Sequence, residues 1–329
     1  MDSGGPILVT GGAGYVGAHV CKALAAAGHL PVTYDDLSTG RRELVKWGPL
    51  ELGAIGDRAR LAETFLRTRP RAVIHLAGLV TGADGPFDMD SFYRVNVEGG
   101  ITLLRAMAEA GVKSLVFCSS AAVYGVPETL PVDETEPLDA ITPGGTSKAM
   151  IERALPDFAR AHGIDWLALR VFNAFGADSD GEAGEWHEPE THLVPSTILT
   201  ALGAREALDV YGTDYGTSDG TTVRDYVHVA DVAEAHLKAL GHVLAGGQST
   251  AVNIGTGRGR SISEIIESVE RVSGRMVTLR EAPPRPGDAP VLIANPGRAA
   301  RLLKWKPRHV DLDAAMRTAY DWHAARLGA

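Results

Sequence analysis

Three glycines near the start of the chain have a type and spacing that suggest a specific chemistry. Gly11, Gly14 and Gly17 form a G-x-x-G-x-x-G pattern directly after the apolar stretch at residues 7–10. Glycines there allow a tight turn and let backbone N–H groups at a helix start approach a pyrophosphate. A glycine spacing alone is weak evidence for such a site, but its place between a strand pattern and a helix pattern strengthens that evidence. The pattern indicates a dinucleotide site.

Two acidic residues support this interpretation and indicate which dinucleotide binds. The next apolar stretch ends in Asp35 and Asp36, close to the offset of about 20 residues expected for a carboxylate that contacts the ribose. Carboxylates accept hydrogen bonds from a ribose 2′-OH and repel a 2′-phosphate. The pair therefore favours NAD over NADP.

Strand-length apolar runs alternate with helical patterns through the first half of the chain. The expected strands are residues 7–10, 31–34, 72–76, 114–119 and 166–171. The expected helices are residues 16–27, 61–68, 92–110 and 147–162. The segment before the last of them should begin a helix too, with Thr142 as its cap and Pro143 at its first position. This alternation implies right-handed crossovers, with helices on both faces of a parallel sheet. We expect an α/β fold with a doubly wound, Rossmann-type parallel sheet.

The regular alternation ends after Phe172. A stretch rich in Gly, Asp and Glu follows at residues 177–190, and later loops at 212–220 and 283–296 are rich in glycine or proline. Such loops suit a small lobe that closes over a ligand. We expect a dinucleotide-binding domain at residues 1–176, to which some later segments return, and a smaller C-terminal α/β substrate lobe at residues 177–329.

Composition limits the partners and the compartment. The formal net charge of −9 offers no basic surplus for nucleic acid or an acidic membrane surface. Cys21 and Cys118 lie far apart in apolar stretches, which favours reduced thiols over a disulfide framework. No apolar run approaches the roughly 20 residues that span a bilayer. We expect a soluble, cytoplasmic protein.

Ordered motifs along nearly the whole chain resemble the extended short-chain dehydrogenase/reductases, and among them the UDP-glucose 4-epimerases. The motifs are VTGGAGYVGAHV, VIHLAG, VNVEG, FCSSAAVYG, PGGTSK, LRVFNAFG, GTDYGTSDGTTVRDYVHVADVA, NIGTG and RPGD. The resemblance implies that bound NAD takes a hydride from C4 of a UDP-hexose and returns it to the other face of the 4-keto sugar. It also implies a homodimer, paired through the helices expected at 92–110 and 147–162.

The resemblance implies a Ser, a Tyr and a Lys as catalytic residues. Ser120 matches the Ser, Lys148 matches the Lys that lowers the Tyr pKa, and Gly144 stands where the family has its Tyr base. Loss of this acid–base group removes about 10²–10⁴ in rate. The enzyme is then slow, uses another proton carrier, or is an engineered variant. Ser120 relayed through water is the first substitute base, and Tyr124 is a poorer one.

Three classes of function stay open. The first is UDP-sugar 4-epimerisation, and the second is other 4-keto-sugar chemistry, such as dehydration or net oxidation. The third is a binding protein that holds NAD and a nucleotide sugar without turnover.

The resemblance also implies two sets of contact residues. Those expected at NAD are Gly11, Gly14, Tyr15, Val16, Gly17, Asp35, Asp36, Leu37, Ser38, Thr39, Gly40, Ala54, Ile55, Leu76, Ala77, Gly78, Asn96, Ser119, Lys148 and Phe172. Those expected at the nucleotide sugar are Ser120, Asn173, His192, Leu193, Tyr211, Arg224, Arg285 and Asp288. Ala54 and Val80 stand where related epimerases often carry an Asp and a Lys, so two polar cofactor contacts are lost. Leu292 matches a residue that gates the sugar pocket.

Histidines and glutamates between residues 182 and 192 have the right types for a metal site. They are Glu182, Glu185, His187, Glu188, Glu190 and His192. Because the segment lacks a compact ligand motif and a supporting Cys, we expect a solvated loop and no metal.

Overall fold

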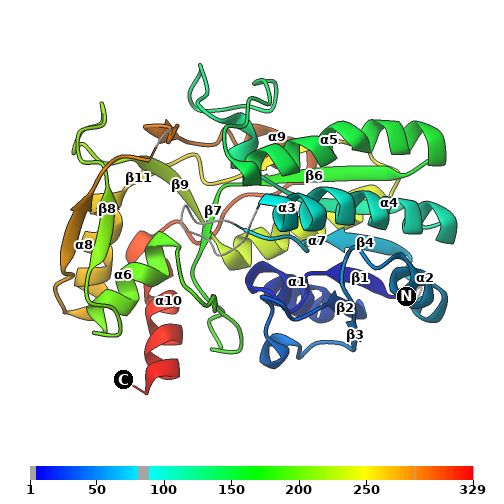
Figure 1. The fold of residues 1–329 in the computed structure, drawn as a ribbon, viewed down its shortest axis with the longest axis horizontal. Helices are drawn as coiled ribbons and strands as arrows, with labels where there is room; N and C mark the ends of the chain where they lie inside the picture. The colour runs from blue at the N-terminus through cyan, green and yellow to red at the C-terminus, as the bar shows by residue number, and fades with distance from the viewer. Residues whose placement is uncertain (1–4, 81–88, 286, 329) are drawn as a thin grey trace.

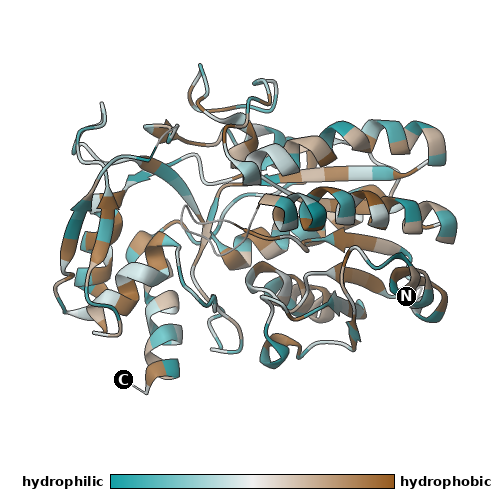
Figure 2. Cartoon of the chain, viewed as in Figure 1, coloured by the Kyte–Doolittle hydropathy of each residue, from teal (hydrophilic) through white to brown (hydrophobic). Residues whose placement is uncertain are grey.

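The structure, a computed structural model, describes residues 5–80, 89–285 and 287–328. The chain forms a larger lobe around a parallel sheet and a smaller lobe that carries the C-terminus (Figure 1). Figure 2 shows apolar residues concentrated in the central strands β1 (Ile7–Thr10) and β4 (Ala72–His75). All residues of these two strands are buried. The larger core therefore forms around this sheet.

Within the described ranges, seven strands form the sheet of the larger lobe, in the order β10-β6-β5-β4-β1-β2-β3, with parallel pairing throughout. Its remaining strands are β2 (Pro31–Asp35), β3 (Leu50–Leu52), β5 (Ser114–Ser120), β6 (Asp165–Val171) and β10 (Thr250–Ile254). The predicted doubly wound α/β fold is confirmed. β3 and β10 are additions to the predicted strands.

Helices cover both faces of this sheet. α1 (Tyr15–Ala26), α7 (Val229–Leu244) and α9 (Gly297–Leu302) pack on one face, and α2 (Arg58–Thr68), α4 (Gly99–Ala110) and α5 (Pro143–His162) pack on the other. Because α7, β10 and α9 follow residue 177 in the chain, the larger lobe is completed by segments from the C-terminal half. Short α3 (Met89–Tyr93) joins α4 through the π-helical turn Arg94–Glu98.

The smaller lobe has its own apolar core. Its helices are α6 (Leu193–Ala201), α8 (Ile262–Ser273) and α10 (Leu312–Leu327). Its strands are β7 (Asn173–Phe175), β8 (Leu208–Tyr211), β9 (Val223–His228), β11 (Gly259–Ser261), β12 (Leu279–Ala282) and β13 (Val291–Leu292). The Tyr15 hydroxyl donates a 2.6 Å hydrogen bond to the Gly176 carbonyl, which fixes the start of α1 to the segment that enters this lobe.

The strand order reverses direction between β1 and β4, which are paired neighbours. In open α/β sheets, ligands bind beyond the carboxyl ends of the strands at such a switch point. The topology therefore points to the loops after β1 and β4 as the ligand site.

Candidate active site

The turn after β1 requires glycine for steric reasons. Gly11 has φ +74°, and a Cβ there would lie 2.5 Å from the Ala77 backbone nitrogen. A Cβ on Gly17 would lie 2.0 Å from the Gly11 carbonyl oxygen. Gly14 is the N-cap of α1 and contributes no capping side chain. The first N–H groups of α1 are therefore left for a ligand, as a pyrophosphate site requires.

Both predicted acidic residues lie at the carboxyl end of β2. The buried carboxylate of Asp35 accepts hydrogen bonds from the backbone N–H groups of Ala13 and Leu37, at 3.0 and 2.9 Å. Exposed Asp36 accepts from the backbone and hydroxyl of Ser38. A carboxylate offers about four acceptor positions, so both retain capacity for ribose hydroxyls. Asp35 also supports the glycine turn, a role that the sequence did not predict.

The remaining expected NAD contacts follow the ends of neighbouring strands. Leu37, Ser38, Thr39 and Gly40 follow β2, Leu76, Ala77 and Gly78 follow β4, Ser119 and Ser120 end β5, and Phe172 follows β6. Ala54 and Ile55 follow β3, and the Tyr34 hydroxyl donates to the Ala54 carbonyl. Because the strands are parallel, these segments share one edge of the sheet.

Asn96, in the π-helical turn, holds the loop after β4 in place. Its side-chain oxygen accepts from the Leu79 N–H at 2.7 Å, and its amide donates to the Leu79 carbonyl and to the Ser147 hydroxyl. π-helical turns are frequent at functional sites. Asn96 thus links the loop after β4 to α5.

Lys148 projects from α5 toward the same loop. Its Nζ donates a 2.8 Å hydrogen bond to the Cys118 carbonyl and lies 5.0 Å from the centre of the Phe117 ring. A Cβ on Gly78 would lie 3.7 Å from this Nζ. Burial lowers the pKa of Lys148, and Cys118 and Glu152 offset part of that effect. The ammonium is therefore held beside the loop after β4, close to the glycine turn.

Gly144 lies one helical turn before Lys148, in the first turn of α5. The predicted start of this helix is confirmed, since Thr142 caps it by accepting from the Gly145 N–H and Pro143 is its first residue. Gly145 is needed there because a Cβ would lie 2.1 Å from the Ala122 carbonyl oxygen. Gly144 is helical and half-buried. Spacing of four residues puts Gly144 and Lys148 on one helix face.

The structure separates the two suggested substitute bases. The Tyr124 hydroxyl donates to Asn253 and accepts from Arg170, and burial raises its pKa to about 12. Tyr124 is therefore a structural residue. Ser120 ends β5, and its hydroxyl accepts the Ala122 N–H at 3.1 Å. It remains able to donate to a substrate oxygen or a water.

A buried ion pair behind the site was missed by the sequence analysis. Arg170 of β6 and Glu152 of α5 form a two-pronged pair whose side chains are each about 95% buried, and the Ser119 hydroxyl donates to Glu152. The sequence held a signal for Glu152. It follows Lys148 by four residues, as Lys148 follows Gly144, so all three lie on one face of α5. The pair fixes α5 against the end of the sheet.

Four of the residues expected at the nucleotide sugar lie together in the smaller lobe. Arg224 of β9 forms an ion pair with Asp288, and the Arg285 guanidinium stacks 3.8 Å from the centre of the Tyr211 ring. The Asp288 N–H donates to the Arg285 carbonyl. The Arg285 Nε is buried and has no hydrogen-bond partner among the described residues. Two neighbouring guanidinium groups, one of which keeps this Nε–H as a donor for a ligand, suit a diphosphate.

The other expected sugar contacts lie elsewhere. Asn173 is exposed at the start of β7, and Leu193 begins α6. The His192 side chain contacts Glu185 and Glu190, with its Nδ1 at 2.9 and 3.1 Å from their carboxylate oxygens. The expectation of a solvated loop was wrong for these glutamates, because both side chains are only 8% exposed. The segment packs against α10, where the Trp322 Nε1 donates to the Glu185 carbonyl.

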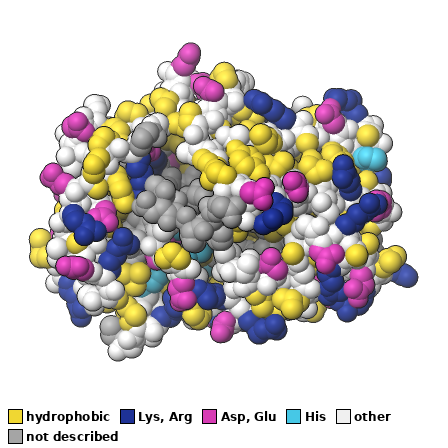
Figure 3. Space-filling view, viewed as in Figure 1, with side chains coloured by type: hydrophobic (Ala, Val, Ile, Leu, Met, Phe, Trp, Pro, Cys, Tyr) yellow, Lys and Arg dark blue, Asp and Glu magenta, His cyan; other side chains and the backbone are white. Residues whose placement is uncertain are grey.

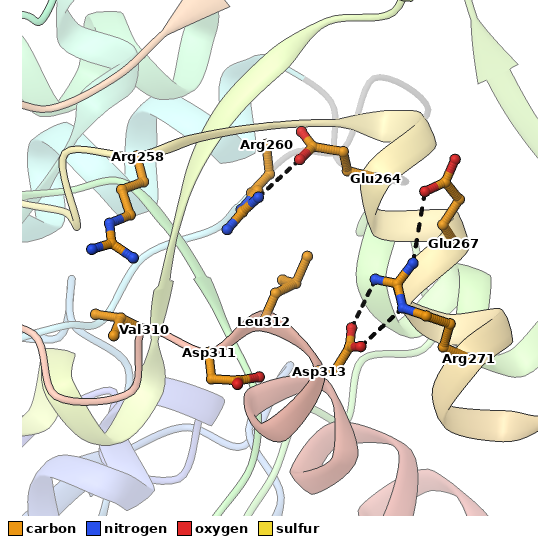
Figure 4. A pocket seen from close by; sticks show the side chains of 9 residues that line it. All are labelled: Arg258, Arg260, Glu264, Glu267, Arg271, Val310, Asp311, Leu312 and Asp313. Atoms are coloured by element: carbon orange, nitrogen blue, oxygen red, sulfur yellow. Dashed lines mark hydrogen bonds and ion pairs between the residues drawn. The ribbon is translucent and has the colours of Figure 1, made fainter.

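A separate pocket of about 500 Å³ lies on the smaller lobe (Figure 4). It is lined by Arg258, Arg260, Glu264, Glu267, Arg271, Val310, Asp311, Leu312 and Asp313. Arg260 pairs with Glu264, and Arg271 pairs with Glu267 and Asp313. Because none of these lining residues is among those expected at NAD or at the nucleotide sugar, this pocket is distinct from the site at the switch point.

On the face shown in Figure 3, basic and acidic side chains are interspersed. Among the described helices, none is both long and apolar enough to cross a membrane.

The comparisons with known proteins agree with this geometry. Residues 7–255 match the NAD-dependent epimerase/dehydratase family. The chain belongs to this family. The sequence resemblance is thereby confirmed, and NAD is the cofactor of the family. The glycine turn fits it, since Gly11 and Gly17 let the backbone segments pack closely and the helix start at Gly14 carries no capping side chain, which leaves its first N–H groups for a pyrophosphate.

Relatives within the NAD-dependent epimerase/dehydratase family match over nearly the full chain. The UDP-glucose 4-epimerase of Rhizobium meliloti is 47% identical over 97% of this chain and 97% of its own. The crystal structure of UDP-glucose 4-epimerase from Brucella ovis in complex with NAD has a TM-score of 0.93 at 46% identity, covering 96% of this chain and 98% of that one. The epimerase from Stenotrophomonas maltophila, with bound NAD and formylated UDP-arabinopyranose, has a TM-score of 0.93 at 38% identity, with 99% and 100% covered.

Proposed function

We propose that the protein interconverts UDP-linked hexoses of the glucose and galactose type by NAD-dependent epimerisation at C4. The observation that carries this proposal is the position of Lys148, whose Nζ lies beside Gly78 at the edge that also holds the glycine turn. The relatives named above as UDP-glucose 4-epimerases support it. The residues assigned to NAD in the sequence analysis form the cofactor site in this proposal.

Each residue of the site has a defined task in the proposed reaction. NAD, held by the glycine turn and Asp35, would supply the acceptor for the hydride of the sugar C4 and the donor that returns it to the opposite face. Lys148 holds positive charge beside the nicotinamide ribose, and Ser120 donates a hydrogen bond to the reacting sugar oxygen. Gly144 contributes no proton carrier. Ser120, relayed through water, therefore takes the proton of the C4 hydroxyl as the 4-keto sugar forms and gives it back when the hydride returns. This step limits the rate.

The smaller lobe binds the nucleotide sugar in this proposal. Arg224 and Arg285 pair with the diphosphate, and Asp288 accepts from ribose hydroxyls. A relative from Bifidobacterium longum was solved with NAD⁺ and UDP. Leu292 is paired with Arg224 in the sheet and is smaller than an aromatic side chain. It leaves room for an N-acetylated sugar.

A second candidate follows from Gly144. Without the family's Tyr, the chain could hold NAD and a nucleotide sugar without turnover. The retained positions of Ser120 and Lys148 favour an enzyme, since binding alone does not require a buried ammonium at this edge.

The proposal is tested by product analysis of the native chain. The protein is incubated with NAD and, separately, with UDP-glucose, UDP-galactose and their N-acetyl forms, and the anomeric proton signals are followed by NMR. We expect slow conversion of each sugar into its C4 epimer. Absence of conversion, with NAD and UDP-sugar binding intact by calorimetry, would establish the binding protein instead. Accumulation of a 4-keto-6-deoxy sugar would establish a dehydratase.

We also propose a cytoplasmic homodimer paired through α4 and α5. Met150 on α5 is 43% exposed, so this helix offers apolar surface to a second copy. Cys21 and Cys118 are unpaired, which suits a reducing compartment.

A further inference from the structure

Two histidines and two glutamates converge between β7 and α6. They are Glu185, His187, Glu190 and His192, and one donor atom from each lies within 4.8 Å of all the others. Of the four, only His192 was assigned to the sugar site. The cluster therefore needs a separate explanation.

Four distances between imidazole and carboxylate donors of this cluster are close to those in a tetrahedral metal site. Zn–N and Zn–O bonds of about 2.0–2.2 Å place neighbouring donors about 3.3–3.6 Å apart in a tetrahedron. The His192 Nδ1 lies 2.9 Å from Glu185 and 3.1 Å from Glu190. The His187 Nδ1 lies 3.3 Å from Glu185 and 3.7 Å from Glu190. Each of these four distances differs from the tetrahedral value by no more than a few tenths of an ångström, and the two histidines face different oxygens of Glu190.

Hydrogen bonding within the protein does not account for His187. Its Nδ1 is buried and has no hydrogen-bond partner in the described part of the chain, although two carboxylates lie close to it. Buried polar atoms without a partner are rare and indicate a missing ligand, water or ion. This ring nitrogen faces the carboxylates of Glu185 and Glu190.

The charge of the cluster points to a cation rather than to an anion. Both glutamate side chains are more than nine-tenths buried, and among the described residues their ion pairs are with His187 and His192 alone. Burial of carboxylates requires compensation by nearby positive charge. Without an ion, protonated His187 and His192 supply this charge. One divalent cation would replace their protons and neutralise both carboxylates while the imidazoles act as neutral ligands.

A neighbouring acidic group shows the contrast. Asp178, Asp180 and Glu182 also lie close together, but the Lys22 Nζ contacts all three, at 2.8, 2.7 and 2.8 Å. Its counter-charge is a lysine ammonium, which has no acceptor for a metal ion. The group serves as an internal control.

We propose that Glu185, His187, Glu190 and His192 bind one divalent first-row transition metal ion, of which Zn²⁺ is the natural probe. Mixed imidazole and carboxylate ligands select such ions over Mg²⁺ and Ca²⁺, which prefer oxygen alone. Four protein ligands make a closed, structural site. Glu190 also accepts the N–H groups of Thr191 and His192 at the start of α6. The ion would therefore fix the preceding loop to the first turn of α6.

The test uses the full chain without a polyhistidine tag, stripped with a chelator and titrated with Zn²⁺. We expect one Zn²⁺ per chain by elemental analysis after gel filtration. We also expect Tm to rise by about 5 °C at a hundredfold excess over Kd. Co²⁺ in place of Zn²⁺ should give the intense visible absorption of tetrahedral coordination. An equal rise in Tm with Mg²⁺, or no retained Zn²⁺, would overturn the proposal.

Variants locate the ion. His187→Gln alters a partly exposed side chain and should fold, and it should weaken Zn²⁺ binding at least tenfold. Glu185→Gln should remove binding altogether. Asp180→Asn in the group held by Lys22 is the matched control and should bind Zn²⁺ like the native chain. Equal Zn²⁺ binding by native, His187→Gln and control chains would place the ion elsewhere and contradict the assignment.

Discussion

Gly144→Tyr raises the rate of UDP-sugar epimerisation by about 10²–10⁴-fold, the usual contribution of a general acid–base group. The new phenol lies one helical turn before Lys148, whose ammonium stabilises the phenolate. The backbone accepts the change, because Gly144 is helical and is not among the glycines with positive φ. The substitution also gains about 0.5 kcal/mol of helix stability.

The measurement is kcat for UDP-galactose conversion, with Gly144→Phe as the matched control. Phenylalanine has the same ring without the hydroxyl, so it should leave the rate at or below the native value. An equal gain in both variants would show that the ring acts by filling space. A Gly144→Tyr chain that holds NAD and stays as slow as the native protein would refute the role given to position 144.

Lys148→Met lowers kcat by about 10²–10³-fold, the range for loss of one preorganised electrostatic group. Methionine keeps most of the aliphatic length but removes the charge beside Gly78 and the hydrogen bond to the Cys118 carbonyl. The loss should be larger in the Gly144→Tyr background, because there Lys148 also lowers the phenol pKa. A double-mutant cycle measures this coupling, expected at about 1–3 kcal/mol.

Lys148→Arg is the control that keeps positive charge, and it should retain more activity than Lys148→Met. The pH profile gives a second readout. Burial lowers the pKa of Lys148, so its charge is lost as pH rises at a lower pH than for an exposed lysine. Activity of the Gly144→Tyr chain should therefore decline on the alkaline side. If the effects of Lys148→Met and Gly144→Tyr on kcat were additive, Lys148 would act on the cofactor alone.

The features predicted from sequence depend on local rules. The turn from Gly11 to Gly17 follows from steric demands of neighbouring residues, and the start of α5 follows from the capping rule at Thr142. The central sheet was predicted because each strand and each helix has its own local apolar periodicity. Each of these signals lies within about 20 residues of chain.

The features that were missed depend on contacts between distant segments. β10 joins the sheet beside β6, more than 75 residues earlier, and periodicity does not reveal such a neighbour. The Arg170–Glu152 pair and the burial of Glu185 arise from how elements pack. An acidic loop is usually solvated, and only the fold showed that this one turns inward.

The most direct test of the account follows deuterium placed at C4 of UDP-galactose. The central claim is that the hydrogen removed from C4 as a hydride returns to C4 of the same sugar without exchange with solvent hydrogen. Native and Gly144→Tyr proteins are incubated in light water with this substrate, and the UDP-glucose formed is examined by NMR and mass spectrometry. The account predicts that the product keeps its deuterium at C4, in both proteins and at very different rates. Product that carries solvent hydrogen at C4 would contradict it.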